Sequence, residues 1–181
     1  MSLLPADEAV AGSRLLALDG TSKAALWTKP MEAACDNAEA SEPEIISCGA
    51  GNMLLHGRSL ALLRPILGPH CEFLPVTWQG KIGYLVNVLG CAACLDQNRS
   101  RWAIGQVSGK KLRVEKYVFL RGSVPSQPVF KIEESCFDLF CASICGAKQD
   151  LKSLVTLHSI TGLEFDEVWS DEESQPEAVR F

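Results

Sequence analysis

Long apolar runs are missing from this sequence. No stretch approaches the roughly 18 consecutive apolar residues that indicate a membrane-spanning helix. The first residues, MSLLPADEAVAGSRLL, also lack the basic start and long apolar segment of a secretory signal, and they place Asp7 and Glu8 where such a signal is apolar. We therefore expect a cytoplasmic protein with no membrane partner.

The motifs of the common catalytic sites are missing as well. The sequence has no G-x-S-x-G, no P-loop, no G-x-G-x-x-G and no H-E-x-x-H. Its three histidines, His56, His70 and His158, carry little weight, because eight cysteines and three histidines supply Cys–His pairs by chance alone. We expect no catalytic residue, no metal and no cofactor, and a protein that acts by binding another protein.

The sequence does contain enough apolar material for a core, and its charge is unevenly spread. Its 181 residues are 47% hydrophobic and 22% charged, which suits one domain, with or without a short appended segment. Residues 1–60 hold four basic and eight acidic side chains, residues 61–132 hold ten and three, and residues 133–181 hold three and eleven. Such a chain can pair its own segments or present an acidic face to a basic partner.

The eight cysteines suggest two interpretations. Most have apolar neighbours, as in GCAACL and LFCASIC, and a free cysteine behaves as a small buried hydrophobe, so we expect reduced thiols. The alternative is a zinc- or thiol-dependent enzyme, because two pairs of cysteines have spacings that suit a tetrahedral metal site. These pairs are Cys91 with Cys94 and Cys141 with Cys145.

Periodicity in the first half predicts helices and a β-hairpin. We expect a short helix over 7–18, a surface helix or irregular connection over 31–44, and a helix over 54–67 with Ser59 as its N-cap and Gly68 and Pro69 as its stop. The runs CEFLPVTW and KIGYLVNVL flank Gln79 and Gly80, which predicts a hairpin in which Pro75 marks an edge or a bulge. Residues 89–95 are expected to turn helical.

The second half predicts further strands. A hairpin around Ser108 and Gly109 has an alternating second strand over 112–120, whose basic residues we interpret as a solvated face: Lys110, Lys111, Arg113 and Lys116. A short strand at VFKIEE, a strand and helix over 137–155 and a last strand after Gly162 follow. Without regular βαβ alternation, this order predicts an α+β fold, mostly antiparallel sheet with a few packed helices, in a single domain.

We divide the sequence into three parts. Residues 1–45 form an N-terminal extension or cover, residues 46–170 form the α+β domain, and residues 171–181 form an acidic, partly disordered tail.

Acidic clusters are the candidate binding residues. They can be a solvated strand face and tail, a metal or acid–base pair, or a surface that imitates nucleic acid for a basic partner. A nucleic-acid ligand is disfavoured because the whole chain is acidic. The candidate residues are Glu133, Glu134, Glu164, Asp166, Glu167, Asp171, Glu172 and Glu173.

Three stretches, in order, resemble one family. RSLALLRPILGPHCEFLPV contains a run like E-F-L-P-V, GYLVNVLGCAACLDQNRS is similar to a Y-x-L-N-V segment with a following L-D and S, and HSITGLEFDEVW is similar to a terminal G-L-E-F-x-x-V strand. Together they resemble immunity family eleven of bacterial polymorphic toxin and type VI secretion systems. The resemblance covers roughly residues 45–170 and leaves the long N-terminal part and the filling around Cys91 and Cys94 without a counterpart.

The resemblance implies an antidote that binds a cognate secreted toxin, with nucleases among the expected toxins. It implies no active site and leaves the oligomeric state open. A scaffolding module with another protein partner is the remaining alternative. The matching residues are expected to determine the fold, with apolar core positions, hydrogen-bonding positions such as Asn87 and Asp96, and a turn glycine. They are Phe73, Leu74, Pro75, Asn87, Asp96, Gly162, Leu163 and Phe165.

Overall fold

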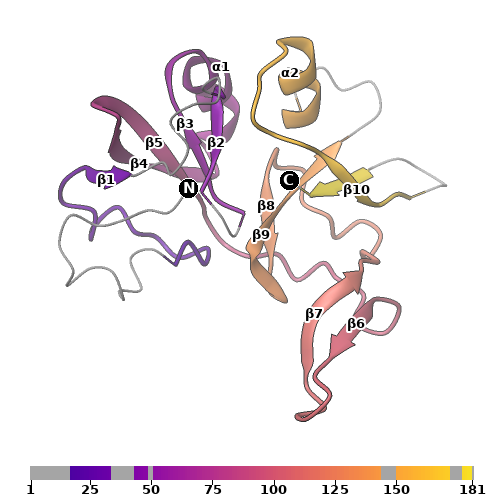
Figure 1. Cartoon of the computed structure of the whole chain (residues 1–181). Coiled ribbons are helices and arrows are strands. Elements are labelled where there is room, and N and C mark those ends of the chain that lie inside the picture. Colours follow the sequence, from indigo (N-terminus) through magenta and orange to yellow (C-terminus); the bar gives the residue numbers. More distant parts are fainter. Residues whose placement is uncertain (1–16, 34–42, 49–50, 144–149, 172–176, 181) are drawn as a thin grey trace.

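The computed structural model describes residues 17–33, 43–48, 51–143, 150–171 and 177–180. In these ranges the chain is α+β, with two helices and strands in mostly antiparallel sheets (Figure 1), so the predicted α+β class and the mostly antiparallel sheets are confirmed. Neither described helix is long and apolar enough to cross a membrane. The predicted helix over 7–18 falls mostly outside the described residues.

The first sheet has the strand order β1-β4-β5-β3-β2. The strands are β1 (Met31–Ala33), β2 (Ile45–Ser47), β3 (Met53–Leu55), β4 (Cys71–Trp78) and β5 (Lys81–Val88). β1 is parallel to β4, and the other pairs are antiparallel. The start of the stretch 31–44 is therefore a strand, and not the helix or irregular connection that we expected.

The predicted β4–β5 hairpin is confirmed. Gln79 and Gly80 both have positive φ angles, 47° and 73°, which suits a two-residue turn between antiparallel strands. The expectation for Pro75 holds in part. β1 pairs only with Val76–Trp78, so β5 is the one strand paired with Pro75 among the described strands, and the ladder shows no bulge there.

The helix expected over 54–67 is shorter, because Leu54 and Leu55 belong to β3 and pair with β5. Helix α1 (Gly57–Leu67) begins after His56 and ends at Gly68, as the stop signal predicts. Ser59 is not the N-cap: its hydroxyl accepts a hydrogen bond from the His56 backbone N–H at 3.3 Å. The backbone pairing of Leu54 and Leu55 overrides their helical spacing.

The second sheet has the order β10-β11-β9-β8. Its strands are β8 (Phe130–Ile132), β9 (Ser135–Ser143), β10 (Asp166–Trp169) and β11 (Glu177–Arg180), and helix α2 (Leu151–Leu157) follows β9. β8, β9, α2 and β10 match the predicted elements. β11 corrects the expectation of a polar, partly disordered tail, because it pairs with both β9 and β10.

Residues 89–95 are irregular, and not helical as expected, with isolated β-bridges at Ala92 and Leu95. The backbone N–H of Ala92 donates to the Lys131 carbonyl at 2.7 Å, and Leu95 forms an isolated bridge with Phe119. Gly90 has a φ of 77°, outside the helical region. Pairing with distant segments therefore fixes this stretch.

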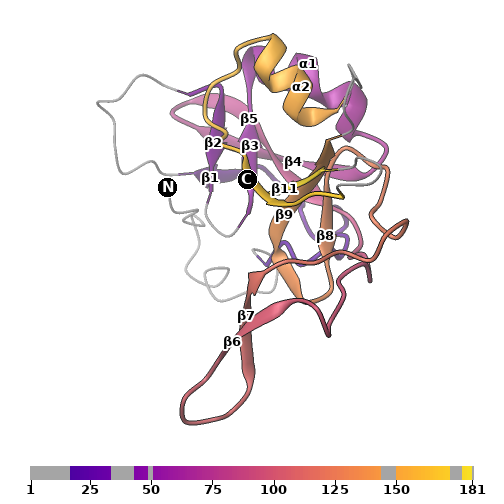
Figure 2. The same ribbon diagram turned by 90° about the vertical axis from the view of Figure 1, so that its right-hand side faces the viewer.

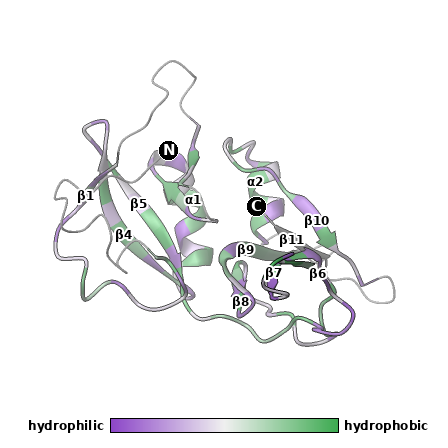
Figure 3. Ribbon diagram, turned by 60° about the horizontal axis from the view of Figure 1, so that its bottom comes forward, coloured by the Kyte–Doolittle hydropathy of each residue, from purple (hydrophilic) through white to green (hydrophobic). Residues whose placement is uncertain are grey.

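The core consists of three clusters. The first joins both sheets and both helices, with members such as Val86, Leu139, Leu63 and Leu151. The second lies between the first sheet and the N-terminal segment, and the third is an aromatic group around Phe140. Figure 3 shows apolar residues on the helices and on the strands beneath them.

The N-terminal segment is tied to the first sheet by polar contacts that the sequence did not reveal. The Glu72 carboxylate accepts from the backbone N–H of Lys23 at 2.8 Å and from the Asn87 amide at 2.9 Å. Burial by itself raises the pKa of Glu72, but these hydrogen bonds and one from Ser22 outweigh it, so the pKa lies below its ordinary value. Residues 21–24 are thereby fastened to β4 and β5.

Candidate binding surface

The strands β6 (Arg101–Ile104) and β7 (Lys111–Lys116) form a separate two-stranded ribbon. It is the hairpin predicted around Ser108 and Gly109. Figures 1 and 2 show this ribbon projecting away from the two larger sheets. On β7 only Val114 is buried, so the expected alternation of buried and solvated residues does not continue along the strand. Apart from Val114 and the half-buried Trp102 and Ala103, the two strands of the ribbon are exposed.

Apolar side chains are exposed near the tip of the ribbon. Val107 is fully exposed, Leu112 is 67% exposed and Ile104 is 53% exposed. The tip has a defined backbone, because the Gly105 N–H donates to the Lys110 carbonyl at 2.9 Å and the Gly109 N–H donates to the Gly105 carbonyl at 2.8 Å. These apolar groups are therefore held outward on a hydrogen-bonded turn.

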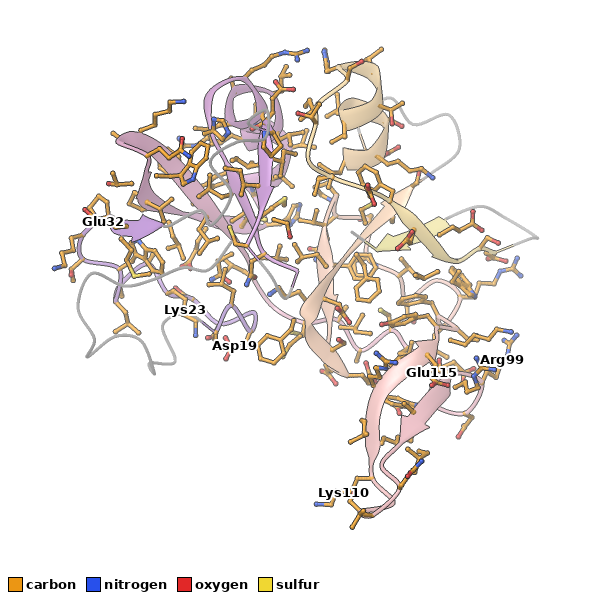
Figure 4. All side chains as sticks on the ribbon, viewed as in Figure 1. Asp19, Lys23, Glu32, Arg99, Lys110 and Glu115 are labelled. Carbon is orange, nitrogen blue, oxygen red and sulfur yellow. The ribbon has the colours of Figure 1, made fainter. Side chains whose placement is uncertain are left out.

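Basic side chains surround the apolar ones. Arg101 pairs with Glu115 at 3.3 Å, and the Lys111 amine lies 4.3 Å from the centre of the Trp102 ring. Four further cations, all exposed, make no ion pair with any residue that the structure describes: Arg99, Lys110, Arg113 and Lys116. Figure 4 shows Lys110 at the far end of the ribbon and Arg99 and Glu115 near its base.

A groove separates the ribbon from β10. It consists of two cavities of about 740 and 570 Å³ that share Lys116, Tyr117, Glu167 and Val168 among their lining residues. Cations of β7 line one wall and carboxylates of β10 and the following residues line the other. Charges of opposite sign thus face one groove.

The structure uses part of the predicted acidic surface internally. Asp171 accepts two hydrogen bonds from the Arg121 guanidinium, at 2.8 and 3.1 Å, so its charge is partly neutralised within the chain. Glu164, Asp166 and Glu167 are exposed on or beside β10. Glu172 and Glu173 lie outside the described residues. The uneven charge of the sequence is therefore partly paired within the chain, and three of the acidic candidates are exposed.

Glu133 and Glu134 form the turn between β8 and β9, away from the β10 carboxylates in sequence. Glu133 is exposed, whereas Glu134 is half-buried and accepts a hydrogen bond from the Gln97 side-chain amide. The turn and β10 belong to opposite edges of the second sheet, so the structure does not gather all the acidic candidates into one patch.

The cysteines proposed as metal ligands are separated. Cys94 belongs to the third core cluster and Cys141 to the first, while Cys145 lies outside the described residues. The described cysteines are free thiols. Burial raises the pKa of Cys94 to about 11, with the Glu134 charge adding to the effect, and burial also raises the pKa of Cys91. Within the described ranges, no three His, Cys, Asp or Glu side chains form a group able to hold a metal ion.

A buried lysine is the feature that the sequence analysis missed. Lys131 is 1% exposed, and its amine donates to the backbone carbonyl of Leu18. Burial lowers its pKa from the ordinary value. The sequence carries no signal for this burial, because strand alternation places Lys131 on the face opposite the apolar Phe130 and Ile132, and only the structure shows that both faces of the strand are covered. Lys131 joins the N-terminal segment to the second sheet.

The residues of the family-like motifs occupy structural positions. Leu74 is buried, and Phe73, Leu163 and Phe165 are half-buried against the first cluster. Asn87 donates to the Thr21 carbonyl at 2.9 Å.

Two further motif residues shape turns. The Asp96 carboxylate accepts from two turn N–H groups, those of Asn98 and Arg99, both at 3.0 Å. Gly162 has a φ of 102°, and an added Cβ there would lie 1.8 Å from the Ile45 carbonyl oxygen. These residues make structural contacts, and among the described residues the ribbon exposes apolar and basic side chains together.

Comparison with known proteins adds no relative. No protein-family model matches the chain, and no curated protein matches it. The resemblance to immunity family eleven therefore stays a prediction.

Proposed function

We propose that this chain is an immunity protein that binds and neutralises a cognate antibacterial toxin. The observation that carries the proposal is the projecting β6–β7 ribbon, which exposes Ile104, Val107 and Leu112 beside unpaired cations. Exposed apolar groups with a polar surround are typical of surfaces that bind other proteins. The three family-like motifs, in their order, are the second support.

The proposal includes where and how the protein acts. It binds the toxin in the cytoplasm of the producing cell and of its siblings, where a toxin delivered by type VI secretion arrives. Binding blocks the toxin without turnover of a substrate. A surface for this task must be formed before the toxin arrives, and the hydrogen-bonded ribbon tip meets that requirement.

We also propose that the chain folds as a single domain. The first core cluster contains Val86 of one sheet, Leu139 of the other, and Leu63 and Leu151 of the two helices. Because these elements share one cluster, opening one sheet exposes apolar surface of the other. Urea unfolding should therefore give coincident transitions by circular dichroism and by tryptophan fluorescence, and two separate transitions would contradict the single domain.

The proposed function implies a toxin gene beside the gene for this chain. The experiment is co-expression of that neighbouring gene with and without this chain, scored by cell survival. Wild-type chain should restore growth. A variant with Ile104→Ser, Val107→Ser and Leu112→Ser should protect less, because it removes the apolar part of the ribbon.

A matched control uses three apolar residues of similar exposure that lie outside the ribbon. Leu26, Ile82 and Leu157 are 65%, 68% and 71% exposed. Changing these three to serine should leave protection intact. Cell death in the presence of abundant, folded wild-type chain would overturn the proposed function.

A further inference from the structure

We propose that the ribbon docks onto an acidic protein face that contains an apolar hollow. This inference rests on the proposed function and adds the chemistry of the partner. It reverses the sign of the expectation from the sequence, in which acidic residues of this chain meet a basic toxin cleft.

The first step is the unpaired charge of the ribbon. Arg99, Lys110, Arg113 and Lys116 lie within an 18-residue stretch and make no ion pair with the described residues. Glu115 is the single carboxylate of this stretch, and it already pairs with Arg101. A partner that approaches the ribbon therefore meets a surplus of positive charge, which favours carboxylates on its own face.

The second step is that exposed apolar groups and unpaired charges lie together on the ribbon. Protein interfaces derive most of their binding energy from a few desolvated anchors, and charges mainly set association rate and partner choice. The ribbon has Ile104, Val107 and Leu112 as exposed apolar groups. The exposed residues of β10 are Asp166 and Glu167, and its apolar residues, Val168 and Trp169, are half-buried. Of the ribbon and β10, only the ribbon combines exposed apolar groups with unpaired charge.

The third step is the order of the tip. The Gly105–Lys110 and Gly109–Gly105 hydrogen bonds fix the turn, and Lys111 is held over Trp102 and donates to Gln97 at 3.1 Å. A surface that is ordered before binding loses less conformational entropy on association. The ribbon is therefore prepared to insert its tip into a hollow of complementary shape.

A protein partner fits these features better than a nucleic acid. Glu167 lines the same groove as Lys116 and Arg113, and Glu164 and Asp166 are exposed beside it. A polyanion that followed the basic side chains to the base of the ribbon would meet these carboxylates, which repel phosphate. A compact acidic face that receives only the tip and the outer strands avoids that repulsion.

The test compares two charge reversals on the same chain. The ribbon variant has Lys110→Glu, Arg113→Glu and Lys116→Glu, and the matched control has Glu164→Lys, Asp166→Lys and Glu167→Lys. All six positions are exposed, so both variants should fold, which circular dichroism verifies. The probe is the purified product of the neighbouring toxin gene, inactivated at its catalytic residue. Association rates are measured at about 50 mM and about 300 mM salt.

The ribbon variant should associate at least about 10-fold more slowly at low salt and lose most of the salt dependence. The control should associate as fast as the wild type or faster. Slower association of the control, with an unaffected ribbon variant, would overturn the inference. So would wild-type binding to a DNA duplex of about 20 base pairs that the ribbon variant loses.

The two proposals fail in distinguishable ways. If the wild type binds and neutralises the toxin and neither reversal changes the association rate, the inference about the partner is wrong and the proposed function stands. If the wild type neither binds the toxin nor protects cells, both are overturned.

Discussion

The core of the two larger sheets and the β6–β7 ribbon are built in opposite ways. The first draws strands and helices from many parts of the sequence and buries residues such as Leu55 and Leu63 completely. The ribbon is one local hairpin with a single buried side chain on β7, Val114. This contrast indicates that the first region supplies stability and that the ribbon is available for contact. Stability should therefore respond to changes in one region, and binding to changes in the other.

The largest effect is expected for Phe140→Ala. Phe140 is completely buried and its ring lies 5.7 Å from Phe130 and 5.3 Å from Tyr117. Removing it should lower the free energy of unfolding by about 3–5 kcal/mol. Urea unfolding measures this, with Val107→Ala on the ribbon as the control, for which the change should stay below about 0.5 kcal/mol. Equal losses in the two variants would contradict the contrast.

Two glycine substitutions, one in the core region and one on the ribbon, compare the cost of an added Cβ in the two regions. Gly162→Ala places a Cβ against the Ile45 carbonyl oxygen at a φ of 102°, so the free energy of unfolding should fall by about 2 kcal/mol or more. Gly109 on the ribbon has a φ of 63° and nothing within 4 Å of an added Cβ, so Gly109→Ala should cost about 1 kcal/mol. Thermal unfolding of both variants shows which substitution lowers the stability more.

Buried thiols make the core sensitive to alkali, with Cys71 in the first cluster and Cys94 in the third. Burial raises the pKa of Cys71 to about 12 and the pKa of Cys94 to about 11, above the ordinary 9.0. Their contribution is present in full below pH 9.0 and is lost as pH rises toward the folded values, because the unfolded thiols ionise first. Each thiol should lower the free energy of unfolding by about 1.4 kcal/mol per pH unit in that window.

Cys94→Ala isolates this effect. Between pH 8 and pH 10 the variant should lose about 1.4 kcal/mol less than the wild type, whatever its starting stability. Urea titrations at the two pH values provide the difference. The same pH dependence in both proteins would show that the Cys94 thiol does not differ between the folded and unfolded states.

The smallest effect on stability is expected for the ribbon triple variant, Ile104→Ser, Val107→Ser and Leu112→Ser. These side chains are exposed already, so the free energy of unfolding should change by less than about 1 kcal/mol. Thermal unfolding measures it beside the survival assay. A large loss of stability together with lost protection would mean that the ribbon supports the fold. That result would contradict the division between a stabilising core and a binding ribbon.

Local patterns predicted those elements whose signals lie within a few residues. Gln79 and Gly80 marked a hairpin turn, Gly68 marked the end of α1, and Gly162 marked the turn before β10, and the structure has each of them there. The turns at Gln79–Gly80 and at Gly162 depend on positive φ angles that few residues adopt readily. Gly68 keeps a right-handed helical conformation, and the Pro69 that follows it marks the end of the helix. In each case neighbouring residues are sufficient to indicate the feature.

Elsewhere, pairing with strands that are distant in the sequence overrode the local sequence patterns. Leu54 and Leu55 have helical spacing but join β5, and residues 89–95 pair with β8 and with Phe119. β11 lies in a stretch that reads as a polar tail, yet it inserts between β9 and β10. The local preference of a residue for helix or strand amounts to roughly a few tenths of a kcal/mol. Backbone hydrogen bonds to remote strands outweigh this preference.

The candidate site shows the same division. The sequence predicted a solvated face for the basic residues of the hairpin, and these residues are exposed in the structure. The acidic residues that the sequence named as binding candidates stay a prediction. Alternation in Leu112 and Val114 predicted that both are turned toward a core, whereas Leu112 is 67% exposed. Only the three-dimensional arrangement shows that no sheet or helix in the described part of the chain covers that side of the ribbon.

The amino-acid sequence by itself determined the α+β class, the hairpin turns, the end of α1 and the uneven distribution of charge, because each follows from local backbone preference or from composition. Tertiary structure decided which charges pair internally, as Asp171 does with Arg121, and which remain unpaired, as Lys110 and Arg113 do. The reason is physical. An ion pair or an exposed apolar patch depends on distances between remote residues, and those distances exist only once the sheets have formed their shared core.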